Sequence, residues 1–344
     1  NINSTVRVKV TNLSDSTVSD TSDLNFKIVG ILALTAPNGG EKWGVQTSQN
    51  IAWTRTGSIA NVKLEYSTNS GSSYPNIINA STAAGALSYS WVIPDAASKT
   101  VRVKISDATD ATVNDTSNAD FAILARFTVN SPNGGEVWVV NGSQNITWST
   151  IGTTSNVCIN YSTNAGSSYD WTVVANAGNS GSYPWIIPDN ISSTAKVKIS
   201  DFNNSDAFDV SDNNFKIRGN LVLIAPNGAE AWTVNTSQAI TWTVTGSIAN
   251  VKLEYSTNSG STYPNIIAAA TVAVTGIYNW TIPDNLSLSA RVKVTDAADS
   301  SVYDESNGDF KIRGVLTLTS PNGNETWTVG SAKNITWTRA GTVV

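Results

Sequence analysis

The stretch VKLEYSTNSGSSYPNII, residues 62–78, contains the pattern on which the fold prediction depends. In VKLEY the apolar residues alternate with charged ones, and this period of two is typical of a β-strand with one buried face. The Ser, Asn and Gly residues that follow predict a turn. The stretch returns at 251–267, and residues 56–78 and 245–267 are identical at 22 of 23 positions. The chain is therefore expected to repeat one β-structured unit.

A second recurrent motif marks where each unit begins. A Pro-Asn-Gly turn followed by Glu and Trp occurs four times, as APNGGEKW (36–43), SPNGGEVW (131–138), APNGAEAW (225–232) and SPNGNETW (320–327). Successive copies are 95, 94 and 95 residues apart. We interpret the chain as the C-terminal part of one repeat, three full repeats and the N-terminal part of another, with bounds at 1–30, 31–124, 125–218, 219–313 and 314–344.

The strand pattern within a full unit predicts its fold class. Residues 31–124 contain about seven short alternating segments, separated by turn residues at intervals of about 8–12 positions, and no helical stretch. This pattern indicates an all-β protein of tandem immunoglobulin-like antiparallel β-sandwiches, although the Cys pair of antibody domains is missing. No Gly/Ser linker separates the units, which favours a stiff rod over beads on a string. We expect each unit to advance the rod by roughly 40 Å.

The partial units at the two ends require completion, because a sandwich cannot bury its core with half of its strands missing. We expect the sequence to be a slice of a longer array. The rival interpretation is a subunit whose two half-domains complete each other between neighbouring chains.

Composition excludes several classes of function. The chain of 344 residues has no His and a single Cys, Cys158, so His-dependent catalysis and an intrachain disulfide are both impossible. The net charge of −5 and the absence of a basic run argue against nucleic acid as a partner. No apolar run is long enough to span a membrane as a helix. We therefore expect a protein that is not an enzyme.

The motifs together resemble a family of extracellular modules. PNGGE-x-W, NITW, SWVIPD (90–95), VRVKISD (101–107) and VNDTSNADFAI (113–123) are similar to the Ser-Thr-rich, GPI-anchored cell-wall domain family. That family includes yeast proteins of β-1,6-glucan assembly, and similar modules occur in tandem in bacterial secreted proteins. The resemblance implies an immunoglobulin-like sandwich outside the cell without a catalytic centre.

Two further motifs are interpreted as structural. STNSGSSY (67–74) resembles the Asp-box hairpin of sialidase-type propellers, with Asn69 in place of the Asp, and in those proteins the box stabilises a turn. The PNGGE loop is glycine-rich, but neither a helix nor a suitably placed Lys follows it, as a phosphate-binding loop requires. The recurrent Glu is expected to accept hydrogen bonds within the turn.

An acidic stretch before the last strand is the candidate for a metal site. Clustered carboxylates there could bind Ca²⁺ at a junction between units, although the spacing fits no EF-hand and Asp is a common turn residue. No other cofactor is expected. The calcium candidates are Asp107, Asp110, Asp115, Asp296, Asp299 and Asp304.

Asn-x-Ser/Thr sequences make sugar attachment a further candidate. The glycosylation candidates, which follow a turn or lie on the outer face of a strand, are Asn145, Asn160, Asn190, Asn285 and Asn334.

The leading functional hypothesis is a structural repeat protein at a microbial cell surface. It would build an extracellular fibre, stalk or sheath by end-to-end or lateral self-association, with glycans attached. The alternative is a tandem array of carbohydrate-binding or adhesive modules in a larger secreted protein. Exposed aromatic platforms would favour that alternative, and Trp171 is the only Trp outside the recurrent positions.

Overall fold

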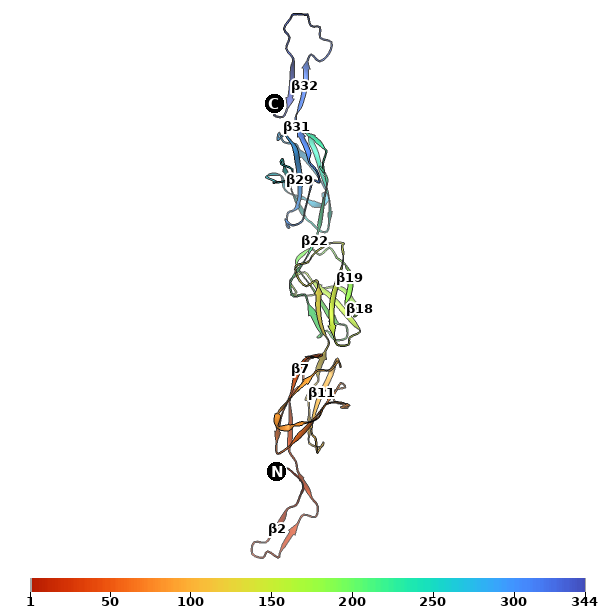
Figure 1. Ribbon diagram of the computed structural model, residues 1–344, viewed down its shortest axis with the longest axis vertical. Helices are drawn as coiled ribbons and strands as arrows, with labels where there is room; N and C mark the ends of the chain where they lie inside the picture. The colour runs from red at the N-terminus through yellow and green to blue at the C-terminus, as the bar shows by residue number, and fades with distance from the viewer. Residues whose placement is uncertain (1, 344) are drawn as a thin grey trace.

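The computed structural model describes residues 2–343, and β-strands connected by turns make up nearly all of it. Three complete units lie in line, and a narrow segment extends from each end of the row (Figure 1). Each complete unit contains a three-stranded and a six-stranded sheet. The prediction of an all-β protein of tandem immunoglobulin-like sandwiches forming a rod is confirmed.

The strands repeat in the same order in each unit. The first complete unit contains β5 (Ile31–Ala36), β6 (Lys42–Gly44), β7 (Ser48–Thr56), β8 (Asn61–Ser67), β9 (Asn76–Ala83), the 3-10 turn η1 (Ala84–Ala86), β10 (Ser88–Val92), β11 (Ser98–Asp107), β12 (Asn114–Thr116) and β13 (Phe121–Leu124). The second contains β14 (Arg126–Ser131), β15 (Val137–Val139), β16 (Ser143–Ile151), β17 (Asn156–Ser162), β18 (Trp171–Gly178), β19 (Ser182–Ile186), β20 (Ser192–Asp201), β21 (Phe208–Val210) and β22 (Phe215–Arg218). The third contains β23 (Asn220–Ala225), β24 (Ala231–Thr233), β25 (Ser237–Thr245), β26 (Asn250–Ser256), β27 (Asn265–Val272), the 3-10 turn η2 (Ala273–Thr275), β28 (Ile277–Thr281), β29 (Ser287–Asp296), β30 (Tyr303–Glu305) and β31 (Phe310–Arg313).

The partial units contain fewer strands. The N-terminal segment has β1 (Asn3–Val6), β2 (Lys9–Thr11), β3 (Ser19–Thr21) and β4 (Phe26–Ile28), and the C-terminal segment has β32 (Val315–Ser320) and β33 (Thr336–Ala340).

The sheet order leaves two neighbouring edges on one flank of each sandwich. In the first unit the small sheet has the order β10-β7-β5, and the large sheet has the order β6-β13-β11-β8-β9 with β12 also paired to β11. Strands β9 and β10 are therefore both edge strands, as are β18 and β19 in the second unit. The pairing is antiparallel except between β6 and β13, which run parallel.

The alternation noted in the sequence decides which face of each strand is buried. On β11, Val101, Val103 and Ile105 have no exposed surface, whereas Arg102 and Lys104 lie on the other face. Burial of the apolar faces of all the strands removes apolar surface from water, which is the main favourable contribution to folding. The Trp of each opening motif joins this core. Trp43 packs against Phe121 and Trp91, with ring centroids 5.0 and 6.1 Å apart.

A buried serine ties the two ends of each unit together. The hydroxyl of Ser211 accepts a hydrogen bond from the Val197 backbone N–H at 2.9 Å and donates one to the Pro132 carbonyl at 2.7 Å. Ser117 and Ser306 make the same pair of bonds in the other units. In the second unit the serine thus links the opening turn to the long strand β20, and both must be in place for its two hydrogen bonds to form.

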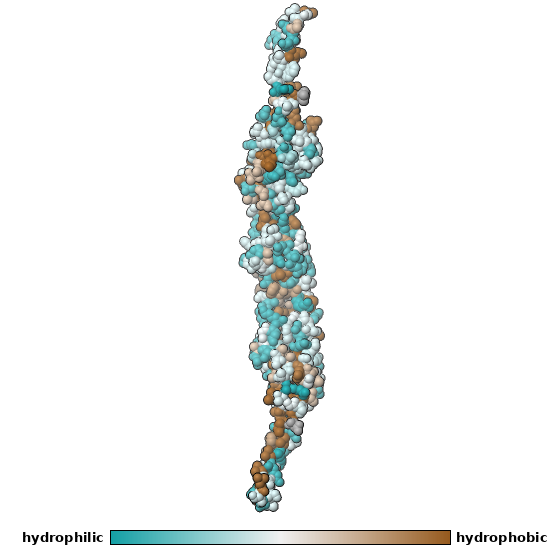
Figure 2. Space-filling model, turned by 90° about the vertical axis from the view of Figure 1, so that its left-hand side faces the viewer, coloured by the Kyte–Doolittle hydropathy of each residue, from teal (hydrophilic) through white to brown (hydrophobic). Residues whose placement is uncertain are grey.

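The partial units expose residues that the complete units bury. Leu318 and Trp337 are 46% and 59% exposed, whereas Leu223 and Trp242, which occupy the same positions in the third unit, are 1% and 3% exposed. Apolar residues are plainly visible along the narrow N-terminal segment (Figure 2). The terminal strands thus carry a core face without the strands that would cover it.

The buried serine yields a prediction about stability. Ser211→Ala leaves the Val197 N–H and the Pro132 carbonyl without a partner inside the sandwich. We expect the second unit to lose about 1–3 kcal/mol of stability. Hydrogen exchange followed by mass spectrometry on peptides of β20 measures this loss as reduced protection.

Ser193→Ala is the matched control, because Ser193 is an exposed serine of β20, the strand whose protection is measured. Its protection should equal that of the unmodified protein. Equal protection in Ser211→Ala as well would contradict the role assigned to the buried hydroxyl.

Candidate functional site

Consecutive complete units are joined by a single residue. Strand β13 ends at Leu124 and β14 begins at Arg126, with only the buried Ala125 between them. Gly219 alone separates the second unit from the third. The last strand of one unit therefore leads directly into the first strand of the next, and the facing loops of the two units come into contact.

A carboxylate at the end of one unit caps a loop of the following unit. Asp95 accepts hydrogen bonds from the backbone N–H and the hydroxyl of Thr153, at 2.8 and 2.6 Å. Asp189 accepts the same two bonds from Ser247, at 2.8 and 2.5 Å, and Asp284 accepts the N–H of Thr342 at 2.9 Å. The Asp of the recurrent Ile-Pro-Asp motif thus bonds to the next unit at three successive junctions.

A glycine with positive φ lets the capped loop approach the preceding unit. Gly152 has a φ of 96°, and a Cβ placed on it would lie 3.1 Å from Cγ2 of Val45 and 3.3 Å from Oδ1 of Asp95. Gly246 makes the equivalent approach to Val140 and Asp189. Both the backbone conformation and the short distances favour glycine at this position.

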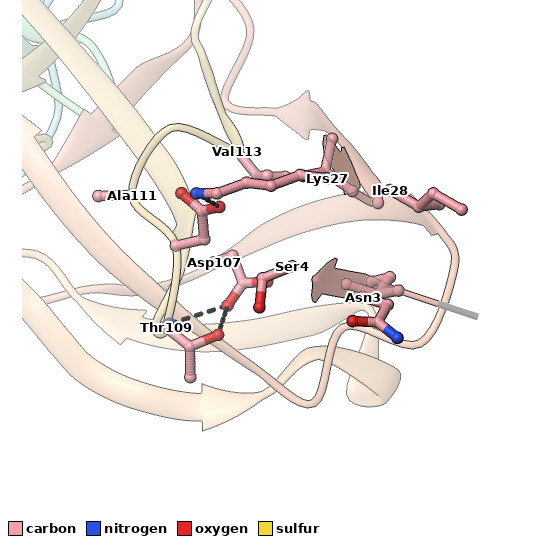
Figure 3. Close-up of a pocket in the computed structure, with 12 residues that line it drawn as sticks. Asn3, Ser4, Lys27, Ile28, Asp107, Thr109, Ala111 and Val113 are labelled. Atoms are coloured by element: carbon pink, nitrogen blue, oxygen red, sulfur yellow. Dashed lines mark hydrogen bonds and ion pairs between the residues drawn. The ribbon is translucent and has the colours of Figure 1, made fainter. Parts of the chain in front are cut away.

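A second kind of contact, present at the first three junctions, pairs a lysine with an aspartate of the next unit. At the N-terminal junction, Lys27 of β4 lies 3.2 Å from Asp110, beside a pocket of about 570 Å³ that Asn3 and Ser4 also line (Figure 3). Lys216 makes the same pair with Asp299 at 2.9 Å between the second and third units.

The junction between the first and second units has an ion pair in a shifted position. Ala122 occupies the position of the lysine on the last strand, and Asn204 occupies the position of the aspartate. Lys42, which is paired with Ala122 across the parallel β6–β13 ladder, instead reaches Asp206 at 2.8 Å. Both members of the pair thus occupy positions different from those at the other two junctions, and a lysine–aspartate pair is present here as well.

The linker residue and the residue opposite it also change together. A Cβ on Gly219 would lie 2.8 Å from the side chain of Ile248, so a larger linker residue does not fit there. At the preceding junction the linker is the larger Ala125, and Thr154 occupies the position of the isoleucine. The smaller facing side chain accompanies the added methyl group, as close packing requires.

The junction contacts lower the pKa of the carboxyl groups that make them. The hydroxyl of Thr153 is the largest cause of the lowered pKa of Asp95, and its backbone N–H adds to the effect. The hydrogen bond from Lys42 lowers the pKa of Asp206. For Asp299, burial raises the pKa, but the bonds from Lys216 and Ser301 together outweigh it and the pKa is lowered.

The six calcium candidates are engaged in separate contacts. Asp107 and Asp296 each accept a backbone N–H two residues ahead, and Asp115 and Asp304 accept the N–H of Leu34 and Leu223. Asp110 and Asp299 do face a junction, where a lysine ammonium neutralises them. Among residues 2–343, no three His, Cys, Asp or Glu side chains are grouped to hold a metal ion.

The five glycosylation candidates differ in accessibility. The side-chain nitrogens of Asn190 and Asn285 donate to the hydroxyls of Tyr161 and Tyr255, at 2.6 and 3.2 Å. Asn160 donates to Thr172 at 3.1 Å. Asn145 and Asn334 are exposed.

The two recurrent turns carry hydrogen bonds that explain their sequences. Glu41 accepts the N–H groups of Asn38 and Gly39, at 2.7 and 2.8 Å, and a cis peptide bond precedes Pro37. In the Asp-box-like turn, Asn69 accepts the hydroxyl of Ser67 at 2.6 Å and the N–H of Ser73 at 3.1 Å. Both motifs stabilise turns, as predicted.

Sequence reasoning missed the residues that cap the junctions. The Ile-Pro-Asp motif marked the period, but nothing in it indicates a partner 58 residues later in the following unit. The glycine that follows a strand at 57, 152, 246 and 341 was a usable signal, because a recurrent glycine indicates positive φ or a close approach.

Comparison with known proteins found matches among solved structures only. No protein-family model and no curated protein matches the chain. The first four Ig domains of Dscam1 match 86% of this chain and 77% of theirs at 12% identity, with a TM-score of 0.29. Titin domains I67–I69 match 83% of this chain and 99% of their own length at 7% identity, with a TM-score of 0.28. The fibronectin(III)-like modules of Clostridium thermocellum CbhA match 54% of this chain and 92% of their own length at 16% identity, with a TM-score of 0.20.

No helix among residues 2–343 has the length and apolar character that crossing a membrane requires.

The close approach at the junction yields a second prediction. In Gly152→Ala the added Cβ meets Val45 and Asp95, so the loop must withdraw from the preceding unit. We expect the orientation of the first two units to become more variable, at a cost of about 1–3 kcal/mol beyond the strain of a positive φ. Residual dipolar couplings report this relative orientation.

Gly135→Ala is the matched control for that variant. Gly135 has a φ of 84°, and no atom lies within 4 Å of a Cβ placed there. It should show only the backbone strain of about 1 kcal/mol, with the inter-unit orientation unchanged. Equal changes in orientation for both variants would contradict the packing role of Gly152.

The lowered pKa values predict an acid-sensitive junction. Asp95 and Asp206 keep their contacts at every pH above the ordinary carboxyl pKa of about 3.9, and lose them as the pH falls through their lowered pKa values. We expect the orientation of the first two units to be constant from about pH 8 to pH 5 and to broaden only when the pH falls below the ordinary carboxyl pKa of about 3.9. Residual dipolar couplings measured across this range test the expectation.

A variant with both Asp95→Ala and Asp206→Ala should show the broadened orientation already at neutral pH. It should also change little on acidification, since both carboxyl groups are gone. A pH response as large as that of the unmodified protein would show that other groups control the junction.

Proposed function

We propose that this chain is a length of a stiff rod and that it serves as a structural protein of an extracellular fibre, stalk or sheath at a microbial cell surface. The observation that carries the proposal is the recurrence of the same capping contact at three successive junctions. A flexible tether would not need a fitted contact at each joint, whereas a rod that transmits force or holds distance does.

The terminal segments support continuation of the rod at both ends. Gly341 already packs against Val234 and Asp284 of the third unit, as the equivalent glycines do at the inner junctions. The exposed core faces of the terminal strands suit completion by adjoining chain or by a neighbouring subunit. Self-association of either kind, end to end or lateral along the edge strands, is part of the proposal.

Surface location, glycans and family membership belong to the same proposal. The motif residues quoted above support membership in the Ser-Thr-rich, GPI-anchored cell-wall domain family. Asn145 and Asn334 are the best-placed acceptors for N-linked sugars, because their side chains are exposed and neither amide contacts a tyrosine. The alternative of a binding array has one specific observation in its favour, the exposed Trp171.

Imaging tests the structural role. In negative-stain and cryo-electron micrographs of the protein as it occurs in its full-length form, we expect smooth straight filaments with an axial repeat of roughly 40 Å. Particles that bend freely at intervals of one unit, or short rods that remain monodisperse at high concentration, would contradict the proposal.

A further inference from the structure

Trp171 differs from the other tryptophans of the complete units in its exposure. Nearly half of its surface, 46%, is exposed, whereas each of the others described there is at most 9% exposed. Trp171 is thus only half-buried, and the exposed part of its ring is open to a ligand.

The ring of Trp171 is held in a fixed position. Trp171 begins the edge strand β18 and is paired with Tyr161 of β17. The two rings are stacked, with centroids 6.2 Å apart and planes inclined by 24°, and Tyr161 in turn packs against the buried Trp185 at 4.9 Å. The exposed indole therefore lies beside Tyr161, at the edge of an aromatic cluster that includes the buried Trp185.

This platform forms part of a groove between the edges of the two sheets. The groove has a volume of about 550 Å³ and lies between β18 and β19. Besides Trp171 and Tyr161, its polar lining comes from Thr172, Tyr183 and Asn190. None of the residues that line it carries a charge.

The corresponding positions in the other units show that the fold does not require a tryptophan. Asn76 and Asn265 occupy the position of Trp171, and each donates its side-chain amide to the carbonyl of the tyrosine beside it, at 3.3 and 3.2 Å. The tyrosine itself is present in all three units. The second unit has thus replaced a local hydrogen bond by an exposed aromatic surface.

We propose that this groove binds a neutral carbohydrate, with one face of a pyranose ring on Trp171. The C–H groups on the face of a pyranose are weakly positive and suit the negative face of an aromatic ring. Sugars whose ring substituents are all equatorial, such as β-linked glucose, present the flattest such face. Tyr183 and Asn190 supply hydroxyl and amide groups for the sugar hydroxyls.

The uncharged lining and the position of Trp171 favour a sugar over other ligands. Acidic or phosphorylated ligands need a cation, and the groove has none. A peptide added to an edge strand would bond to the backbone, and the equivalent edge strands of the other two units have no tryptophan. The proposal does not depend on fibre formation.

Calorimetric titration of the 344-residue chain with cellohexaose tests the proposal, using protein produced without N-glycosylation so that Asn190 carries no sugar. A shallow groove with one platform predicts a dissociation constant on the order of 1 mM. We expect one site per chain, and we expect Trp171→Asn, the residue of the sister units, to weaken binding by at least about tenfold.

Phe208→Ser is the matched control. Phe208 is an exposed aromatic residue of the same unit, 50% exposed, whose ring contacts Lys198 outside the groove. Its loss should leave binding unchanged.

Four outcomes of the titration would overturn the proposal. They are the absence of saturable binding, binding by Trp171→Asn as tight as by the unmodified chain, equal weakening by Phe208→Ser, and a stoichiometry of three sites per chain. A proline-rich peptide that binds in place of the sugar would also overturn it.

Discussion

The constraint on which the rest of the structure depends is the single residue between consecutive units. With only Ala125 or Gly219 as a linker, the ends of two sandwiches cannot avoid contact. The contacts themselves are modest, because an exposed ion pair such as Lys42–Asp206 contributes about 0–1 kcal/mol. Two free domains would not associate through them. The short linker removes most of the entropic cost of association, so weak contacts are sufficient to select one orientation.

The two junctions between complete units show that the fit is maintained while the units diverge. The second unit differs most from its sisters, yet its contact with the first unit retains a lysine–aspartate pair at shifted positions. The change from glycine to Ala125 is matched by Thr154 opposite it. Each change alone would leave a missing charge partner or an overlap of atoms, so the paired changes indicate that the junction is under a physical constraint of its own.

Most of the fold could be predicted from the sequence because the signals are local. Alternation over a few residues identifies a strand and its buried face, and Glu41 or Asn69 acts on N–H groups within four residues. The junction could not be predicted in the same way. Asp95 bonds to a residue 58 positions away across a boundary between units, and Ser117 bonds to Pro37 across 80 positions. The separations of 58 and 80 residues match neither the alternation along a strand nor the length of the repeat, so these contacts can be identified only in the folded structure.

The divergence of the second unit separates two kinds of change. Those at the junction occur in compensating pairs, as packing and charge within the chain demand. Trp171 is paired with Tyr161, which is the same residue as Tyr66 and Tyr255 in units that carry asparagine in place of the tryptophan. The groove contains one further change, Pro184, where the sister units have Ser90 and Asn279. The groove lies on the flank of the sandwich, between β18 and β19, and the residues that line it are not those of the junction contacts. The changes in the groove therefore leave the junctions intact, and a stiff rod can carry a binding site on one unit without altering the joints on either side.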